Sequence, residues 1–188
     1  VFSTGNAEGA GICNISSAEK TTLDYKLSVK EILEFVRSVN INDIDFILDS
    51  VKLNKALADE GLRADYGLKV GRTILSAEHN SIFGYSVMTY AMAATAAASD
   101  ARMAGCTMPA MSNSGSGNQG ITVTVPVIAV AEKLHTSRED LARALTLSHL
   151  IAIHIKGYLG KLSALCGCVI ASTGSSCGIV YLKGGGYD

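Results

Sequence analysis

The apolar residues of this chain recur at the spacing of helices along most of its length. Between residues 44 and 57 they return every three or four positions, which places them on one broad helical face. The order Ser28-Val29-Lys30-Glu31 is a capping box, a pattern that commonly begins a helix. We therefore predict one helix after Ser28 and a second from Asn42 or Asp43, which Gly61 ends as the first residue beyond the helix.

The rest of the chain continues the helical pattern, with two places where a strand is also compatible with the sequence. Thr136 to Glu139 forms another capping box. Residues 121–125 alternate as in a strand, but Pro126 and the apolar residues behind it favour a helix that holds Pro126 in its first turns. Residues 21–27 are compatible with a short strand. Helices are otherwise expected over residues 62–78, 81–104, 137–156 and 162–182.

These elements predict a mostly α protein, a packed bundle of helices in a single domain spanning residues 1–188. Charged residues belong mainly to the amphipathic helices of residues 1–80, whereas residues 81–188 are rich in small side chains. Because small side chains let helices approach closely, we expect the second part to be tightly packed and to carry the site. Its low charge also favours contacts with a second copy of the chain. Since the chain begins at Val1 in a glycine- and serine-rich stretch, we expect a fragment that lacks the N-terminal half of a longer protein.

Composition excludes several classes of function. The 188 residues carry 16 Lys and Arg against 17 Asp and Glu, so no electrostatic argument supports binding to nucleic acid or to an anionic membrane. The longest apolar run, Ser81 to Ala98, is alanine-rich and lacks flanking basic residues, which favours a core helix over a membrane span. The 5 cysteines without a signal peptide do not indicate a secreted disulfide framework, and we expect a cytoplasmic protein.

A polar, glycine-rich stretch at residues 105–120 interrupts the apolar pattern and is the first candidate site. Glycine permits positive φ and close approach of the backbone to a ligand. If a helix begins directly after this stretch, its unpaired N–H groups and its dipole favour a bound carboxylate or phosphate. An ordinary solvated turn has the same composition. The candidate substrate-binding residues are Ser112, Asn113, Ser114, Gly115, Ser116, Gly117, Asn118 and Gln119.

The cysteines are the second candidate site, as metal ligands. Cys166, Cys168 and Cys177 lie in one segment of small residues, and Cys106 precedes the polar stretch. On an unbroken helix Cys166 and Cys177 would be about 16 Å apart, too far for one metal centre, so joint ligation requires a break near Gly174. The alternative is that each cysteine is a small buried hydrophobic residue. A structural zinc site is disfavoured because the sequence has no C-x-x-C pair with a matching histidine pair.

Two further side chains, His79 and Lys156, are candidate catalytic residues, and Lys156 is also a candidate partner for a substrate carboxylate. His79 stands at the expected end of a helix, and Lys156 stands near the end of an apolar helix. A hydrogen-bonded or surface histidine and a solvated helix-end lysine are the more frequent alternatives. The sequence therefore leaves the catalytic base unassigned.

Three segments carry a resemblance to a known family. Residues 109–121 read PAMSNSGSGNQGI, residues 162–168 read LSALCGC, and residues 178–185 read GIVYLKGG. Together they resemble the serine dehydratase α-chain-like family, and within it the branch that contains L-cysteine desulfidase. The resemblance implies a mostly α-helical domain that catalyses β-elimination of L-cysteine or L-serine without PLP. The products would be pyruvate and ammonia, with sulfide from cysteine.

The resemblance also implies a [4Fe–4S] cluster held by three cysteines, whose open iron binds the leaving group of a small amino-acid substrate. Carried over by position, the ligand candidates are Cys166, Cys168, Cys177 and Cys106. The loop from Ser112 to Gly120 would hold the substrate carboxylate or line the cluster. This sequence lacks the Gly-Cys-Thr-Glu-Pro motif of the desulfidase branch. The alternative is a non-catalytic fragment without a cluster, inactive alone, that binds a small molecule or serves assembly.

Overall fold

The computed structural model describes residues 27–76, 84–159 and 165–187, in which helices are the regular elements and no strand occurs. The mostly α fold is therefore confirmed, and the short strand considered at residues 21–27 falls outside the described residues except for Leu27. The first elements are α1 (Val29–Ser38), α2 (Ile41–Ile44), the 3-10 turn η1 (Asp45–Leu48), the π-helical turn η2 (Val51–Lys55), α3 (Ala56–Arg63) and α4 (Val70–Leu75). The longer helices are α6 (Val87–Met103), α7 (Gly117–Leu134), α8 (Arg138–Leu159) and α9 (Gly167–Leu182).

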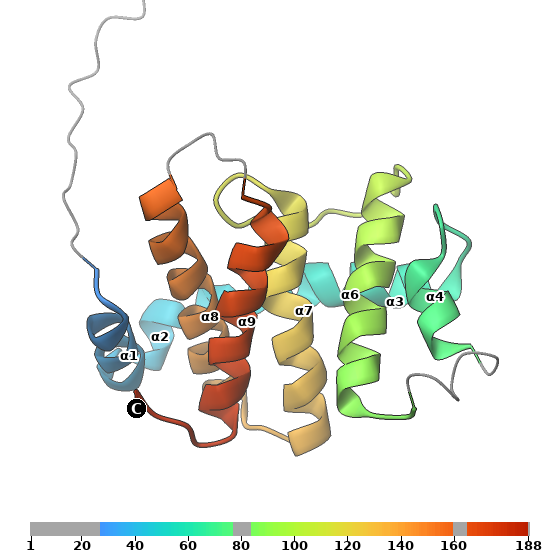
Figure 1. Cartoon of the computed structure of the whole chain (residues 1–188). Helices are drawn as coiled ribbons and strands as arrows, with labels where there is room; N and C mark the ends of the chain where they lie inside the picture. Colours follow the sequence, from blue (N-terminus) through green and yellow to red (C-terminus); the bar gives the residue numbers. More distant parts are fainter. Residues whose placement is uncertain (1–26, 77–83, 160–164, 188) are drawn as a thin grey trace, which may run out of the picture.

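Four long helices stand side by side in a row, in the order α8, α9, α7 and α6, and the helical run from α2 to α3 crosses behind them (Figure 1). At the edges of the row, α1 packs on α8 and α4 packs on α6. Helix α7 contacts α6, α8, α9 and η2, and its residues 119–125 are all buried. A helix enclosed on every side is expected to be apolar all round, as α7 largely is. None of the described helices combines the length and hydrophobicity that crossing a bilayer requires.

Both helix starts predicted from capping boxes are confirmed. Ser28 caps α1, and the Glu31 carboxylate accepts the Ser28 backbone N–H at 2.9 Å. At the start of α8, the Ser137 hydroxyl accepts the backbone N–H of Asp140 at 3.1 Å. The second capping contact therefore uses Asp140 where the sequence pattern suggested Glu139.

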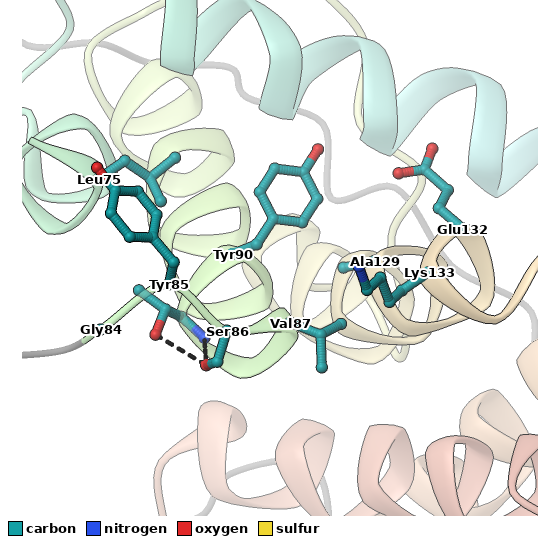
Figure 2. Close-up of a pocket in the computed structure, with 10 residues that line it drawn as sticks. Leu75, Gly84, Tyr85, Ser86, Val87, Tyr90, Ala129, Glu132 and Lys133 are labelled. Carbon is teal, nitrogen blue, oxygen red and sulfur yellow. Dashed lines mark hydrogen bonds between the residues drawn. The ribbon is translucent and has the colours of Figure 1, made fainter. Parts of the chain in front are cut away.

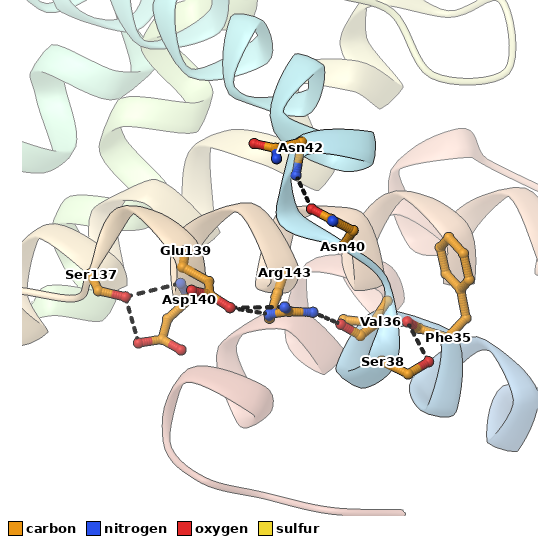
Figure 3. A network of polar contacts seen from close by, with 9 residues as sticks. All are labelled: Phe35, Val36, Ser38, Asn40, Asn42, Ser137, Glu139, Asp140 and Arg143. Carbon is orange, nitrogen blue, oxygen red and sulfur yellow. Dashed lines mark hydrogen bonds and ion pairs between the residues drawn. The ribbon is translucent and has the colours of Figure 1, made fainter.

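One arginine connects the end of α1 to α8 (Figure 3). Arg143 binds the Glu139 carboxylate on its own helix at 2.8 Å and donates to the backbone carbonyl of Val36. Nearby, the Asn40 side chain accepts the N–H of Asn42 at 3.0 Å and caps α2. Beneath these contacts, the apolar cluster that joins α1 to α8 consists of Ile32, Leu33, Val36, Leu147 and Ile151.

Residues 121–125, which the sequence left open between strand and helix, lie inside α7. Their hydroxyl groups are satisfied within the helix, because Thr122 Oγ1 donates to the Asn118 carbonyl at 2.9 Å and Thr124 Oγ1 to the Gly120 carbonyl at 2.7 Å. The prediction that Pro126 lies in the first turns is wrong. The helix already begins within the polar stretch, so Pro126 stands in its middle.

Gly61 does not end a helix, contrary to the sequence-based prediction. It lies inside α3, whose C-cap is Ala64, and a Cβ at this position would collide with the backbone oxygen of Ala97 in α6. Gly71 in α4 meets the backbone oxygen of Ala93 in the same way. The expectation that the alanine-rich helix lets its neighbours approach closely is therefore confirmed, and glycine extends that approach to backbone contact.

We expect Gly61→Ala to lower the free energy of unfolding by about 2–3 kcal/mol, because the added methyl group overpacks a backbone contact. The matched control is Gly157→Ala, which adds its methyl group on α8 with nothing within 4 Å. Alanine is the better helix former there, so that change should raise the free energy of unfolding by about 0.5–1 kcal/mol. Urea unfolding followed by circular dichroism measures both. Equal changes in the free energy of unfolding for Gly61→Ala and Gly157→Ala would contradict the close contact between α3 and α6.

Candidate functional site

One end of the helical row gathers most of the residues selected from the sequence. Helices α6 and α8 end there, and α7 and α9 begin there (Figure 1). The polar stretch joins α6 to α7 at this end, and Cys166 directly precedes α9. Helix starts carry free N–H groups and partial positive charge. The starts of α7 and α9 are therefore suited to an anionic group, whereas the ends of α6 and α8 are not.

A tight turn leads from the polar stretch into α7. The backbones of Asn113 and Ser116 pair with each other, with N–O distances of 3.1 and 3.0 Å. The residues between them, Ser114 and Gly115, have φ angles of 49° and 79°. A positive φ costs energy at a serine. The Ser114 hydroxyl donates to Asn113 Oδ1 at 2.9 Å, a contact that helps to hold this strained turn.

The first turn of α7 faces an arginine. Ser116 caps the helix by accepting the N–H of Gln119 at 3.3 Å, whereas the N–H groups of Gly117 and Asn118 have no acceptor among the described residues. The Arg102 guanidinium lies so close that a Cβ on Gly117 would collide with it, and it donates to Asn118 Oδ1 at 3.1 Å. It has no carboxylate partner within the described ranges. A cation beside a helix start adds positive charge to positive charge, so a bound anion would stabilise this arrangement.

Below this turn, Asn54 in η2 ties the polar stretch to α7. Asn54 is fully buried, and its side-chain oxygen accepts the N–H of Met111 at 2.9 Å. Its amide nitrogen lies 3.2 Å from the carbonyl oxygens of both Met111 and Gly120 and 3.3 Å from Thr124 Oγ1. A buried amide with these contacts fixes the path of the backbone.

His149 in α8 completes the buried network. Its Nδ1 lies 3.2 Å from Asn113 Nδ2, and its Nε2 lies 3.1 Å from Thr124 Oγ1. Burial lowers the pKa of His149 to about 4, so the ring is neutral at pH 7. The Gln119 amide donates to Asn113 Oδ1 at 2.7 Å. The network therefore joins the polar stretch, α7 and α8.

Cys166 and Cys168 lie together at the start of α9, next to α7. Both are exposed as whole residues, although the sulfur of Cys168 is partly buried. Hydrogen bonds from the backbone N–H and the thiol of Cys168 lower the pKa of Cys166. Burial raises the pKa of Cys168, the Cys166 sulfur adds to this, and the Thr122 hydroxyl of α7 opposes it. A cysteine whose thiolate is favoured at a helix start is suited to nucleophilic attack or to metal binding.

The other two cysteines have different surroundings. Cys106 packs against the apolar cluster between α3, α6 and α7, and its contact with Tyr66 raises the pKa of that phenol to about 12. Cys177 is half-buried against the cluster that joins α1 to α8. Within residues 27–76, 84–159 and 165–187, no three His, Cys, Asp or Glu side chains are grouped so that they could hold a metal ion.

The helix break expected near Gly174 does not occur, because α9 runs without interruption from Gly167 to Leu182. Gly174 instead lets α9 approach α8, since a Cβ there would collide with the backbone oxygen of Ser148. On a continuous helix the nine residues from Cys168 to Cys177 correspond to about 13 Å. The reason for expecting Cys177 to join the other two thiols is thereby removed.

The polar stretch and the thiol pair meet through Gln119. Its side-chain oxygen lies 3.1 Å from the position that a Cβ would take on Gly167, between Cys166 and Cys168. Lys156 is half-buried in the last turn of α8, at this same end of the row. His79 lies outside the described residues. Sequence reasoning missed four residues that the structure adds to the site, namely Arg102, Asn54, Thr124 and His149.

A separate cavity lies at the opposite end of the row, where α6 begins and α7 ends (Figure 2). Its volume is about 560 Å³, and Tyr85, Tyr90, Glu132 and Lys133 are among its lining residues. None of the candidate residues that lie within the described ranges lines it. The candidate site therefore depends on the end of the row where α7 and α9 begin.

Comparison with known proteins agrees with the resemblance drawn from the three sequence segments. Residues 13–188 match the family described as serine dehydratase alpha chain. The chain belongs to this family. No solved structure matches the chain.

Curated relatives of this serine dehydratase alpha chain family member are longer proteins. A UPF0597 protein of Phocaeicola vulgatus is 48% identical over 184 residues, which are 97% of this chain and 42% of the relative. A UPF0597 protein of Oleidesulfovibrio alaskensis is 53% identical over 164 residues, 87% of this chain and 38% of the relative. A UPF0597 protein of Clostridium perfringens is 48% identical over 174 residues, which are 92% of this chain and 41% of the relative. The chain thus spans about two fifths of the length of these relatives.

The neutral, buried His149 predicts a pH-dependent stability for this serine dehydratase alpha chain domain. Its pKa is about 4 in the folded state, and a free histidine has a pKa of about 6.5. Between these values only the unfolded chain binds the proton. The contribution of His149 to the free energy of unfolding is therefore fully present above about pH 6.5. It is lost as the pH falls towards 4, by at most about 1.4 kcal/mol per pH unit.

Urea unfolding at pH 7, 6 and 5 tests this prediction when His149→Leu is compared with the parent. The variant should be less stable at pH 7 but should lose less stability on acidification. His154→Leu, the same change on the same helix but outside this network, is the control. All three proteins share the same carboxyl groups, so the difference between His149→Leu and the other two isolates the pH dependence of stability that is due to His149. Equal slopes for His149→Leu and the parent would contradict the buried neutral ring.

Proposed function

We propose that this chain is part of a PLP-independent lyase that catalyses β-elimination of L-cysteine or L-serine. The products would be pyruvate and ammonia, together with sulfide when cysteine is the substrate. Membership of the serine dehydratase alpha chain family supports a lyase of serine dehydratase type. The observation that carries the proposal is the arrangement of an anion-binding helix start, α7, beside the thiol pair at the start of α9.

The start of α7 would bind the substrate carboxylate. Arg102 supplies a guanidinium that lacks a carboxylate partner among the described residues, and Gly117 and Asn118 supply free N–H groups beside it. Hydrogen bonds between a guanidinium and a carboxylate are among the strong ones because both groups are charged. Binding there would also orient the α-carbon of the amino acid relative to the start of α9.

The thiol pair fits part of the ligand set for the implied iron–sulfur cluster. Cys166 and Cys168 are exposed, adjacent and hydrogen-bonded to each other, and backbone N–H groups favour the thiolate of Cys166. The family resemblance implies three cysteines, so we propose that the third comes from outside the described residues. When bound, such a cluster supplies a Lewis acid for the hydroxyl or thiol leaving group.

Removal of the α-proton requires a base with a free lone pair. His149 does not qualify, because hydrogen bonds engage both of its ring nitrogens in the core. Lys156, at the same end of the row, and His79 are the candidates for this step.

The second candidate function is a non-catalytic fragment that binds a small molecule or takes part in assembly. Helix α9 contains no charged residue and exposes Val169 and Val180, as a surface that is covered by protein would. The described residues also provide two adjacent thiols where the resemblance implies three. Under this alternative the α7 start still binds a carboxylate, but no turnover follows.

The proposed lyase predicts that Cys166→Ser and Cys168→Ser lose both iron and activity. Using the full-length protein prepared without oxygen, we expect each variant to form pyruvate from L-cysteine and L-serine at least about 100-fold more slowly. Cys177→Ser is the matched control on the same helix and should retain iron and activity. Iron analysis, acid-labile sulfide and absorbance near 400 nm are the cluster readouts, and pyruvate and ammonia the activity readouts.

Anaerobic full-length protein with neither iron nor deaminase activity would contradict the lyase. Thermal stabilisation by an amino acid without turnover would instead support the binding fragment. If Cys177→Ser loses iron as completely as Cys166→Ser, the division of the cysteines proposed here is wrong.

The carboxylate site predicts that Arg102→Met raises KM for the amino acid by about tenfold or more while kcat changes little, since a charge-assisted hydrogen bond is lost. The KM of Arg102→Lys should lie between that of Arg102→Met and that of the parent, because lysine keeps the charge but lacks the planar guanidinium with its paired donors. The control is Arg63→Met, which removes an exposed arginine paired with Glu60 elsewhere on the surface. Steady-state kinetics measure all three, and an unchanged KM in Arg102→Met would rule out this carboxylate site.

A further inference from the structure

His149 is a buried ionisable side chain for which the proposed elimination has no direct use. We infer that His149 is a positioning residue, whose neutral ring fixes the orientation of the Asn113 amide and, through it, the turn that leads into α7. The ring is 8% exposed and touches neither the start of α7 nor the thiols directly. Its influence on the site must therefore pass through the side chains that it contacts.

The hydrogen bonds select one tautomer of His149. Thr124 Oγ1 has a single proton, which it donates to the Gly120 carbonyl at 2.7 Å. Towards His149 Nε2, at 3.1 Å, it can then only accept, so Nε2 carries the ring proton. Nδ1 keeps its lone pair and accepts from Asn113 Nδ2 at 3.2 Å. Each ring nitrogen thus has one partner of the correct kind.

The ring in turn sets the orientation of the Asn113 amide. Asn113 Nδ2 also donates to the His149 backbone carbonyl at 3.3 Å, and Oδ1 accepts from Gln119 at 2.7 Å and from the Ser114 hydroxyl at 2.9 Å. Rotating the amide by 180° would set its oxygen against the lone pair of Nδ1 and its N–H groups against the Gln119 donor. Only one orientation satisfies all of these groups.

From Asn113 the constraint reaches both helix starts. Its backbone pairs with Ser116, the residue that caps α7. Gln119, held by its bond to Asn113, places its side-chain oxygen against Gly167 at the start of α9. The same amide therefore holds the turn beside the proposed carboxylate site and the side chain beside the thiol pair.

The role depends on hydrogen-bond direction and not on charge. The groups that meet the ring are Asn113 from the polar stretch and Thr124 from α7, and no charged side chain in the described part of the chain hydrogen-bonds it. An apolar residue of the same size would fill the space but leave one N–H of Asn113 Nδ2 without its acceptor, while the other keeps the backbone carbonyl of residue 149. An unpaired buried N–H is costly, so the turn would move to regain a partner.

Two substitutions separate positioning from packing. In His149→Asn the new side-chain oxygen can take the place of Nδ1 and accept from Asn113, although it leaves the larger cavity. In His149→Gln the side chain fills more space but reaches the position of Nε2, towards Thr124. If His149 only fills space, His149→Gln should disturb the turn less, because it leaves the smaller cavity. If His149 positions Asn113, His149→Asn should disturb the turn less, because it keeps the acceptor for Asn113.

Hydrogen exchange in the full-length protein reads the turn directly, because the Ser116 N–H bonds to the Asn113 carbonyl at 3.0 Å. We expect protection of this N–H to fall at least about tenfold in His149→Gln and His149→Leu, and less than about threefold in His149→Asn. The Val39 N–H, bonded to the Phe35 carbonyl at 2.8 Å at the end of α1, is the reference for a backbone hydrogen bond outside this network. A greater loss in His149→Asn than in His149→Gln would overturn the inference.

A measurement on the unsubstituted protein covers the case in which the variants do not fold. The ¹⁵N chemical shifts of the His149 ring should show a protonated Nε2 and a bare Nδ1 from pH 8 to pH 5. A protonated Nδ1 in that range would overturn the inference, and a bare one supports it.

This inference rests on the proposed function only in its last consequence, that KM for the amino acid is higher in His149→Gln than in His149→Asn. The exchange and ¹⁵N results need no activity. If they are as expected and the full-length protein eliminates nothing, the proposed function fails and the positioning role stands. If turnover is found but the exchange order is reversed, the positioning role fails and the lyase stands.

Discussion

The burial of the first turns of α7 is the constraint on which the rest of the structure depends. Residues 119–125 are enclosed by α6, α8, α9 and η2. The helix start also brings polar groups into the interior, and buried polar groups need partners. Those partners come from three elements, as Asn54 in η2, Asn113 in the polar stretch and His149 in α8. The candidate site lies where this enclosure stops, at the first N–H groups of α7.

Close backbone contacts between helices hold in place the helices that carry the site. Gly61 and Gly71 bring α3 and α4 against α6, and Gly174 brings α9 against α8. The Ser148 hydroxyl also donates to the Val123 carbonyl at 2.7 Å, which links α8 to α7. Backbone contacts of this kind involve few flexible side chains. Groups carried on such helices are held more closely in place than groups on a long loop would be.

Features that depend on neighbouring residues were predictable from the sequence, and features that depend on distant ones were not. Ser28 acts within one turn of its own helix, so its sequence pattern was sufficient. The pattern at residues 136–139 located the start of α8 to within one residue, because Ser137 caps it through the N–H of Asp140. Gly61 was misassigned because the same residue type serves as a helix terminator and as a contact point. Asn54 accepts a hydrogen bond from Met111, which lies 57 positions away in the sequence, and no local pattern predicts that contact.

The candidate site shows the same division. The polar stretch was selectable because its composition is unlike that of the flanking helices. Cys166 and Cys168 are close in space and only two positions apart in the sequence, with Gly167 between them. His149 was not selectable, because its partner Asn113 lies 36 positions away. Arg102 carries no local signal of a site, because only the fold places its guanidinium against Gly117. The break expected near Gly174 was an inference from spacing that the packing of α9 on α8 overrules.

The open groups of the site are of two opposite kinds, which bears on the choice between catalysis and binding alone. The start of α7 and Arg102 attract negative charge, whereas the thiolate favoured at Cys166 attracts a cation. A site for a simple anion would need only the first kind. A β-substituted amino acid bound through both its carboxylate and its leaving group needs the two kinds side by side, with a metal at the second. The presence of both kinds at one end of the helical row is what the proposed elimination would require, whereas carboxylate binding alone would use only the first.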